Sequence, residues 1–464
     1  MKRICIAILA LVSALSINSQ VRLPAIFSSN MVLQQKDSVK LWGWADPMEK
    51  IAITTSWNNR TDTAVTKSNA KWELTVMTPS AGGPYRITFK GYRTVSLENV
   101  MIGEVWLCSG QSNMQWNYYG GVKDIDAELK LSAQENIRFF HVPKSASDDL
   151  QDDTQASWSV CDSNSLKGFS AIGYFFGKYL QRKLNVPIGL VHSSWGGTPA
   201  EVWTPKELIE ENYILKQAAE KKPPVPWCPV QPGVVYNAMI NPIKNYPIAG
   251  AIWYQGESNT STPGSYAKLL TTMIDAWRKD WHTDFPFYLV QIAPYTYGNN
   301  LSAAILREQQ SLAAKHYKSG MIVISDLVSD TTDIHPRDKK SVGKRLSDYV
   351  LFYHYKNGNE ADAKSPVYES MVVNDGKAYI NFNYAESGIV SRDKKINALL
   401  IAGTNKVFYP AEAKIEKGKL VAWSKNVKEP VAVRYQFCNA CIGNLVSQTG
   451  LPVAPFRTDD WEVE

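Results

Sequence analysis

Four short polar segments of this chain each follow an apolar stretch, and their residue types could together hydrolyse an ester. The first is Gly110-Gln111-Ser112-Asn113, which follows the β-prone run 102–107. In open α/β sheets, ligands bind beyond the carboxyl ends of the strands. A serine at that edge, at the start of a helix, has backbone N–H groups nearby that can stabilise an oxyanion. Ser112 is therefore a candidate nucleophile, although the same residues could simply form a helix-capping turn.

Two further segments could supply hydrogen-bond donors to the same reaction. Gly196 and Gly197 follow a strand-like run, and paired glycines permit a close backbone approach. Gln255 and Glu257 follow another such run. The amide of Gln255 could donate to an oxyanion, and Glu257 could orient neighbouring side chains. Each segment taken singly is equally compatible with an ordinary strand end.

A general base could come from the segment Thr332-Asp333-Ile334-His335-Pro336. A histidine in a loop before a helix can reach over a sheet edge and take a proton from a serine. A nearby aspartate such as Asp333 can hold the imidazole and stabilise its charged form. The chain has six histidines, and the main rival, His192, lies at a strand end where packing is the simpler role.

The order of the apolar runs predicts three regions. Residues 20–100 contain short β-prone runs separated by turn residues, a spacing typical of a small antiparallel sandwich. Residues 101–356 alternate strand-like with helix-like stretches, which predicts a mostly parallel sheet with helices on both faces. Residues 357–464 return to short strands and predict a C-terminal β-rich region. We therefore expect the α/β fold class, with the four polar segments at one edge of the parallel sheet.

Residues 1–19 are typical of an export signal. Lys2 and Arg3 precede an apolar run at 4–15, which is too short to span a membrane, and small and polar residues follow it. No later run is long and apolar enough to cross a bilayer. We expect an exported protein without a membrane span, either periplasmic or extracellular.

The charge and the cysteines argue against several classes of partner. The net charge of +6 falls to +4 without the two basic residues of the signal, and no long Lys/Arg run favours nucleic acid. The five cysteines beyond the signal are an odd, scattered set rather than a disulfide framework. Cys438 and Cys441 are spaced so that they could pair, and no histidine cluster completes a zinc site. We expect neither a metal nor an organic cofactor.

The four segments occur in the order found in the sialate O-acetylesterases, a family of the wider SGNH hydrolases, which this chain resembles. The matching motifs are Gly-Gln-Ser-Asn-Met (110–114), Ser-Trp-Gly-Gly-Thr-Pro-Ala-Glu-Val-Trp (194–203), Trp-Tyr-Gln-Gly-Glu-Ser-Asn (253–259) and Asp-Ile-His-Pro (333–336). Similarity at 30–34, 41–45, 82–85, 236–240, 306–310 and 450–459 extends the resemblance over nearly the whole chain beyond the signal. It implies an SGNH-hydrolase-like α/β/α arrangement of three layers.

The resemblance also implies roles for individual residues. Ser112 is the implied nucleophile and His335 the implied general base. The implied oxyanion donors are the N–H groups of Ser112 and of Gly196 or Gly197, together with the Gln255 amide. Such an enzyme would transfer the acyl group to the serine and then to water.

The acid partner of the histidine departs from the usual pattern. Many SGNH enzymes carry an aspartate three residues before the histidine, but here that position is Thr332 and the aspartate stands two residues before. Asp333 is our preferred partner, with Asp330, or no acid at all, as the alternatives. Supporting or substrate-binding roles are expected for four further residues: Gln111, Asn113, Glu257 and Arg307. The arginine could meet a substrate carboxylate or could equally be structural.

The expected substrate is an O-acetylated sialic acid, on the family resemblance alone. Acetylated xylan or another plant polysaccharide is the alternative, because related sequences act on both. A catalytically inactive carbohydrate-binding protein is the alternative from another class, and the intact Ser112, Gln255 and His335 argue against it. A lipase is disfavoured, because the sequence shows no long apolar lid or lipid-facing helix.

Overall fold

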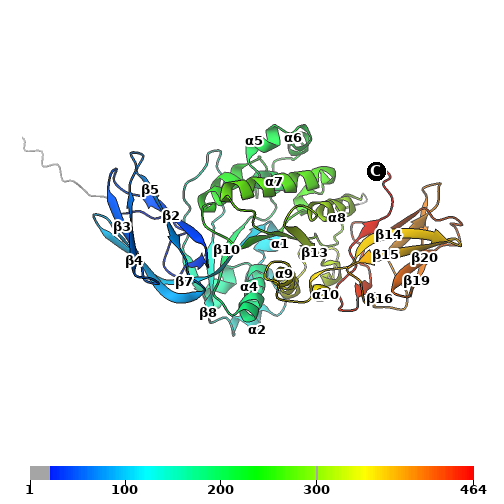
Figure 1. Ribbon diagram of the computed structural model, residues 1–464. Coiled ribbons are helices and arrows are strands. Elements are labelled where there is room, and N and C mark those ends of the chain that lie inside the picture. Colours follow the sequence, from blue (N-terminus) through cyan, green and yellow to red (C-terminus); the bar gives the residue numbers. More distant parts are fainter. Residues whose placement is uncertain (1–20, 299–300, 464) are drawn as a thin grey trace, which may run out of the picture.

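The computed structural model describes residues 21–298 and 301–463, and the expected export signal at 1–19 lies outside them. Three parts follow one another along the molecule: an N-terminal β region, a central α/β region and a C-terminal β region (Figure 1). No helix among the described residues is long and apolar enough to cross a membrane.

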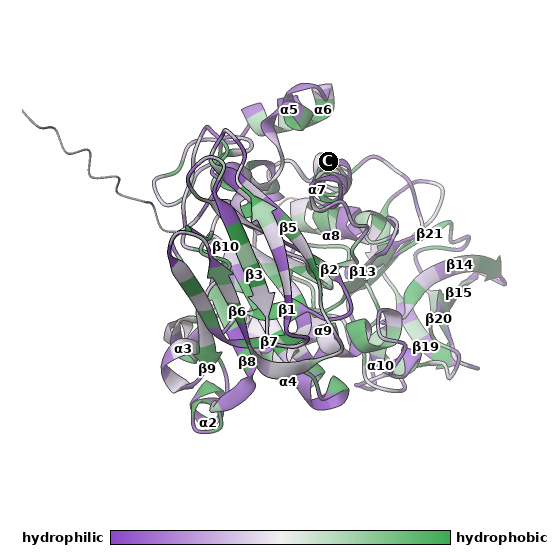
Figure 2. Ribbon diagram, turned by 60° about the vertical axis from the view of Figure 1, so that its left-hand side comes forward, coloured by the Kyte–Doolittle hydropathy of each residue, from purple (hydrophilic) through white to green (hydrophobic). Residues whose placement is uncertain are grey.

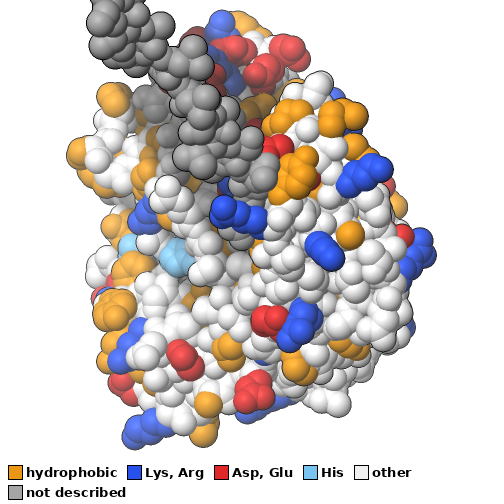
Figure 3. All heavy atoms as spheres, turned by 90° about the vertical axis from the view of Figure 1, so that its left-hand side faces the viewer, with side chains coloured by type: hydrophobic (Ala, Val, Ile, Leu, Met, Phe, Trp, Pro, Cys, Tyr) orange, Lys and Arg blue, Asp and Glu red, His pale blue; other side chains and the backbone are white. Residues whose placement is uncertain are grey.

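The N-terminal region is built from short strands, some of which alternate buried with more exposed side chains. These strands are β1 (Val32–Gln34), β2 (Ser38–Trp44), β3 (Lys50–Thr55), β4 (Arg60–Val65), β5 (Lys71–Met77) and β6 (Gly82–Lys90). Strands β2 and β5 pair with each other, while β3 pairs with both β4 and β6. The period of two places one face of each strand in a common core. Acidic and basic side chains are interspersed over the outer face of this region (Figure 3), and hydropathy varies along its strands (Figure 2).

One long strand, β7 (Thr94–Gly110), joins the N-terminal and central regions. Its first half pairs with β6 in antiparallel fashion, and its second half pairs with two strands of the central sheet in parallel. The expected boundary at residue 100 therefore falls inside a single strand, so the two regions share a continuous backbone ladder.

The central sheet has the order β13-β12-β11-β7-β10-β8-β9. Its strands are β8 (Gln134–His141), β9 (Trp158–Cys161), β10 (Ile188–Ser194), β11 (Gly250–Tyr254), β12 (Phe287–Val290) and β13 (Ser319–Ile322). All pairs are parallel except the edge pair β8–β9. The predicted mixed α/β class with a mostly parallel sheet is confirmed.

Helices cover both faces of the central sheet. Helices α4 (Ala171–Leu184) and α9 (Lys339–Tyr353) contribute to the same core as Trp106 and Cys108 of β7. Helices α7 (Tyr266–Trp281) and α8 (Ser302–Ala313) contribute to the core that holds Val105 and Leu107. Consecutive β7 residues thus face opposite cores, which is why this half of the strand is apolar without alternation.

The two helices α4 and α9 pack unusually closely. A Cβ built on Gly343 of α9 would lie 2.6 Å from the Cβ of Phe175 in α4, so this contact requires glycine. The close packing of α9 against α4 restrains the loop that leads into α9.

The remaining α-helices of the described residues are short: α1 (Ser112–Gln115), α2 (Ile125–Leu129), α3 (Ser163–Gly168), α5 (Lys206–Glu210), α6 (Tyr213–Glu220) and α10 (Glu360–Ala363).

The C-terminal region holds two four-stranded antiparallel sheets around its own core. The first sheet is β14 (Val367–Asn374), β15 (Lys377–Asn383), β20 (Lys419–Trp423) and β19 (Glu412–Glu416). The second is β18 (Phe408–Pro410), β17 (Leu399–Ala402), β21 (Ala432–Tyr435) and β23 (Phe456–Arg457), and β16 (Ile389–Ser391) pairs with β22 (Leu445–Ser447). Cys438 and Cys441 of this region form a disulfide.

Candidate active site

Three neighbouring strands of the central sheet end side by side, and this places the candidate segments together. Gly110, the last residue of β7, lies opposite Ser194 at the end of β10 and Tyr254 at the end of β11. Gly110 has a φ of 137°, and a Cβ there would lie 2.2 Å from the carbonyl oxygen of Tyr254. Only glycine fits this turn, and Ser112 follows it as the first residue of α1.

Ser112 and His335 are in direct contact. The Nε2 atom of His335 lies 2.9 Å from the Oγ atom of Ser112, although 223 positions separate the two residues in the chain. His335 belongs to the loop that precedes α9. At this distance a neutral imidazole can accept the serine proton directly.

An aromatic side chain that the sequence reading missed packs face to face against the imidazole of His335. The ring of Trp116, just after α1, stacks on His335 with ring centroids 3.9 Å apart and an interplanar angle of 18°. The indole N–H of Trp116 donates to the carbonyl of Gly120 at 2.9 Å, which fixes the ring in turn. Stacking of this kind restricts the orientation of the histidine without any acid partner.

Asp333 lies beside His335 but does not hydrogen-bond its ring. One carboxylate oxygen of Asp333 accepts the backbone N–H of His335 at 2.9 Å, and the same oxygen lies 3.9 Å from Nδ1. The other oxygen accepts from Arg337 at 3.0 Å. Burial raises the pKa of Asp333, but these two hydrogen bonds outweigh it and the net pKa is lowered. Asp330 instead binds Thr332, with an Oδ1–Oγ1 distance of 2.6 Å.

The expected oxyanion donors differ in their availability. The N–H of Ser112, in the first turn of α1, has no protein acceptor among the residues that the structure describes. The N–H of Gly196 donates to the side-chain oxygen of Gln115 at 2.8 Å, and a Cβ on Gly196 would lie 3.2 Å from the Cβ of Ser112. Gly197, with a φ of 85°, continues the same turn. The glycine pair therefore lies against the serine, as its position in the sequence suggested.

Gln255 departs from its expected role. Its side chain is fully buried, and its amide nitrogen donates to the carbonyl of Thr198 at 3.2 Å and to Oδ1 of Asn259 at 2.8 Å. Its oxygen accepts from the hydroxyl of Tyr266 at 2.8 Å. Both amide hydrogens already have acceptors, so in this structure Gln255 holds neighbouring loops together instead of offering a donor beside Ser112.

A buried polar network lies behind the serine and the histidine. The Asn113 amide donates to Glu257 at 2.6 Å and to the carbonyl of Ile334 at 3.1 Å, one residue before His335. Its oxygen accepts from the amine of Lys339 at 2.5 Å. The side-chain oxygen of Gln111 accepts the N–H of Gly256 and of Ser258, each at 3.3 Å. These contacts tie the strand ends to the histidine loop.

Lys339 is the second residue that the sequence reading missed, because a lysine at the start of a helix gives no sign that it is buried. Burial lowers the pKa of its amine to about 7. The pKa of His335 is lowered to about 4, first by burial and then by the charge of Lys339. Burial also raises the pKa of Glu257. The imidazole is therefore neutral, the form that acts as a base, at all but acidic pH.

Two candidates lie away from this centre. Arg307 of α8 is buried, and its guanidinium donates to backbone carbonyls of Gln436, Cys438 and Asn439. It anchors the C-terminal region, and these bonds favour the structural alternative over a contact with a substrate carboxylate. His192 is also buried, and its Nε2 atom lies 2.5 Å from the Oγ of Ser194.

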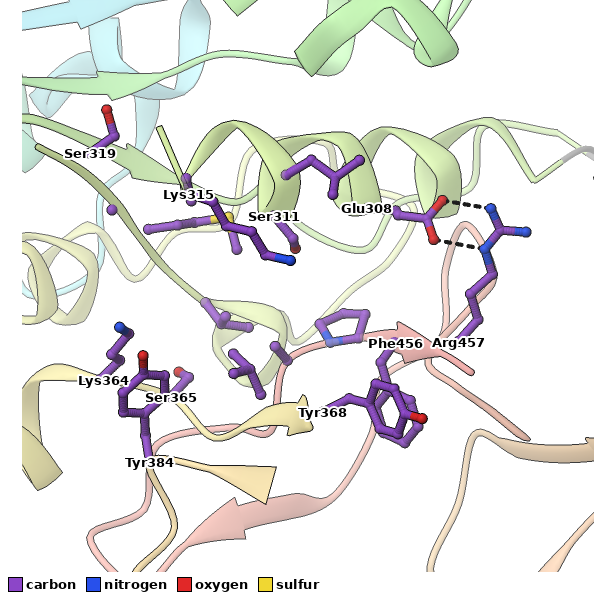
Figure 4. A pocket seen from close by; sticks show the side chains of 18 of the residues that line it. Glu308, Ser311, Lys315, Ser319, Lys364, Ser365, Tyr368, Tyr384, Phe456 and Arg457 are labelled. Carbon is purple, nitrogen blue, oxygen red and sulfur yellow. Dashed lines mark hydrogen bonds and ion pairs between the residues drawn. The ribbon is translucent and has the colours of Figure 1, made fainter. Parts of the chain in front are cut away.

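A separate cavity of about 350 Å³ lies beside edge strand β13, between α8 and the C-terminal region (Figure 4). The Glu308–Arg457 ion pair borders it, and Tyr368 stacks on Phe456 within it. Strands β12 and β11 separate β13 from β7, so this cavity is distinct from the serine–histidine pair. Within the described ranges, no group of three or more His, Cys, Asp or Glu side chains is placed to hold a metal ion.

Comparison with known proteins shows the family to which the chain belongs. Residues 102–351 match the family described as "Carbohydrate esterase, sialic acid-specific acetylesterase". The sialate O-acetylesterase of Mus musculus is 30% identical over 389 residues, covering 70% of this chain and 72% of the mouse protein. The human sialate O-acetylesterase is 29% identical over 419 residues, covering 81% of this chain and 79% of the human protein.

A solved structure extends the similarity to the whole fold. The crystal structure of a carbohydrate acetylesterase from Xanthomonas citri matches 95% of this chain and 100% of its own, with a TM-score of 0.87 and 31% identity. The family resemblance seen in the sequence is therefore confirmed. The chain belongs to the family of carbohydrate esterases described as sialic acid-specific acetylesterases, and it is a carboxylic-ester hydrolase.

Proposed function

We propose that this protein removes acetyl groups from O-acetylated sialic acids through an acyl-enzyme formed on Ser112. The 2.9 Å contact between Ser112 Oγ and His335 Nε2 carries the proposal. It supplies a nucleophile and a base at the carboxyl edge of a parallel sheet, where ligands of such sheets bind. The sialate substrate is taken from the relatives, whose names specify it.

In the first half of the reaction, the Ser112 oxygen attacks the acetyl carbonyl while His335 Nε2 accepts the serine proton. The Ser112 N–H and the adjoining Gly196–Gly197 turn stabilise the negative charge that develops on the carbonyl oxygen. Use of the Gly196 N–H requires Gln115 to release it. The bond between carbonyl carbon and sugar oxygen then breaks, and the sugar oxygen takes the proton from His335.

In the second half, water attacks the acetyl-serine and gives a proton to His335. The carbon–Oγ bond breaks, acetate leaves, and Oγ recovers the proton. Asp333 stabilises the imidazolium through space, and Trp116 keeps the ring in place. Every step uses groups of this chain and water, so the proposal invokes neither a metal nor an organic cofactor.

The proposed setting is outside the cytoplasm, in the periplasm or beyond the cell. The basic pair followed by the apolar run at 4–15 supports export. Three parts are proposed for the exported chain: a β-sandwich at 20–100, an SGNH-like three-layer catalytic region at 101–356 and a β-rich region at 357–464. The helices on both sheet faces support the three-layer arrangement.

Acetate release tests the proposal. The purified protein, Ser112→Ala and the surface control Ser387→Ala are incubated in parallel with O-acetylated sialic acids and with acetylated xylan fragments. We expect release from the sialic acids by the wild type and by the control, and a loss of at least about a thousandfold in Ser112→Ala with unchanged thermal stability. Release from the xylan fragments alone would show that acetylated xylan, and not O-acetylated sialic acid, is the substrate. Full activity of Ser112→Ala would refute the mechanism.

A further inference from the structure

An exposed tryptophan lies against the Gly196–Gly197 turn. A Cβ built on Gly197 would lie 2.8 Å from the indole nitrogen of Trp227 and 2.9 Å from its Cδ1 atom, so the edge of the indole lies against this glycine. Gly196, one residue earlier, lies against Ser112. Trp227 is 65% exposed, although a tryptophan of a folded protein is usually highly buried. A large apolar ring therefore faces solvent beside the nucleophile.

The indole is held on a rigid support. Val225 and Cys228 form an isolated antiparallel bridge, which closes a tight turn with Pro226 and Trp227 at its tip. Proline at this position of a turn fixes the backbone in advance. The carbonyl of Trp227 accepts the indole N–H of Trp195 at 3.2 Å, and Cys228 is buried. The backbone of the turn is thus fixed on both sides of the exposed ring.

We propose that Trp227 forms the subsite for the sugar ring that carries the acetyl ester. This inference rests on the proposed function and adds to it the residue that recognises the alcohol part of the ester. When the acetyl carbonyl lies between Ser112 and the Gly196–Gly197 turn, the leaving alcohol must extend out of the site toward solvent. The flat indole beside that turn offers a pyranose ring an apolar surface. The rigid support lowers the entropy lost on binding.

The geometry predicts that loss of the Trp227 indole impairs the hydrolysis of sugar esters but not of esters that lack a ring. Removing the indole leaves the serine, the histidine and the oxyanion donors in place, so an ester without a ring should react as before. A sugar ester should lose binding equally in its ground and transition states, which raises KM and leaves kcat unchanged. We expect KM for the sugar ester to rise about tenfold, the change typical of an aromatic contact residue at a binding surface.

The test compares Trp227→Ala, Trp227→Phe and wild type on an O-acetylated sugar and on ethyl acetate, with acetate release as the readout. Tyr213→Ala removes another exposed aromatic side chain, from α6, and serves as the matched control. We expect the defect with the sugar ester in Trp227→Ala alone, largely restored in Trp227→Phe, with ethyl acetate hydrolysis unchanged throughout. The sugar ester used is whichever of the sialic acids or xylan fragments the wild type hydrolyses faster.

Each other outcome overturns the inference. An unchanged KM for the sugar ester in Trp227→Ala would show that the ring makes no contact with the sugar, while the proposed esterase activity would stand. Equal losses on both esters would assign the indole a structural role in the turn. Absence of acetate release by the wild type from every ester would refute the proposed function itself, and the subsite with it.

Discussion

Replacing Lys339 with glutamine should move the acid limb of the pH–activity profile upward by about one pH unit. Lys339 is buried, and its amine binds Asn113, which in turn holds the carbonyl before His335. Glutamine keeps a hydrogen-bond donor for Asn113 and removes only the positive charge. The change therefore tests whether that charge controls the basicity of His335.

The magnitude follows from two distances. Trp116 stacks 3.9 Å from the imidazole, and the amine of Lys339 lies 5.9 Å from the Trp116 ring, so amine and imidazole are within about 10 Å of each other. At that separation, with an effective dielectric constant of about 20, a unit charge changes the free energy of protonation by about 1.7 kcal/mol. This corresponds to slightly more than one pK unit.

The sign is set by the role of the imidazole. His335 acts as a base only when neutral, so activity falls as pH drops through its pKa of about 4. Without the lysine charge the pKa rises, and the acid limb should appear near pH 5. The pKa of Lys339 is about 7, so the amine is largely neutral at pH 8 and both proteins should there show similar kcat/KM.

The assay is kcat/KM for acetate release between pH 3.5 and 8, with folding checked at each pH by circular dichroism. Lys340→Gln, at the next position and half-exposed, is the matched control and should leave the acid limb unchanged. An unshifted limb in Lys339→Gln, or an equal shift in the control, would refute the electrostatic reasoning. Loss of activity at every pH would instead make Lys339 a purely structural residue.

Two further substitutions test the acid partner and the buried charge pair. Asp333→Asn keeps an acceptor for the backbone N–H but removes the charge that lies 3.9 Å from the imidazole, and kcat/KM should fall about tenfold, whereas Asp330→Asn should match the wild type. Lys178→Met leaves the carboxylate of Glu128 buried without its main partner, which should lower the free energy of unfolding by about 3 kcal/mol in urea titrations. The same substitution at the exposed Lys344 should cost less than about 1 kcal/mol, and equal losses at both sites would contradict the assignment of the buried pair.

Local patterns in the sequence predicted the fold class and made Ser112 and His335 candidates, and the family resemblance implied their roles. The alternation of strand-like and helix-like runs reports burial on a sheet between helices, and the resulting mostly parallel sheet is observed. Ser112 and His335 each lie within a recognisable motif, and the fold brings both to one edge of the parallel sheet. The sequence did not predict that a single strand crosses the expected boundary at residue 100, because nothing in the composition shows that β7 continues through it.

The tertiary structure alone decided which side chains lie around Ser112 and His335. Trp116, Lys339 and Trp227 acquire their places through contacts with residues that are distant in the chain, and no local spacing records such contacts. For the same reason the sequence suggested an oxyanion role for Gln255 and could not decide between a substrate-binding and a structural role for Arg307, whose hydrogen bonds are made to loops and to the C-terminal backbone, respectively. A motif fixes residue type and local backbone, whereas hydrogen-bond partners and burial depend on how remote segments pack.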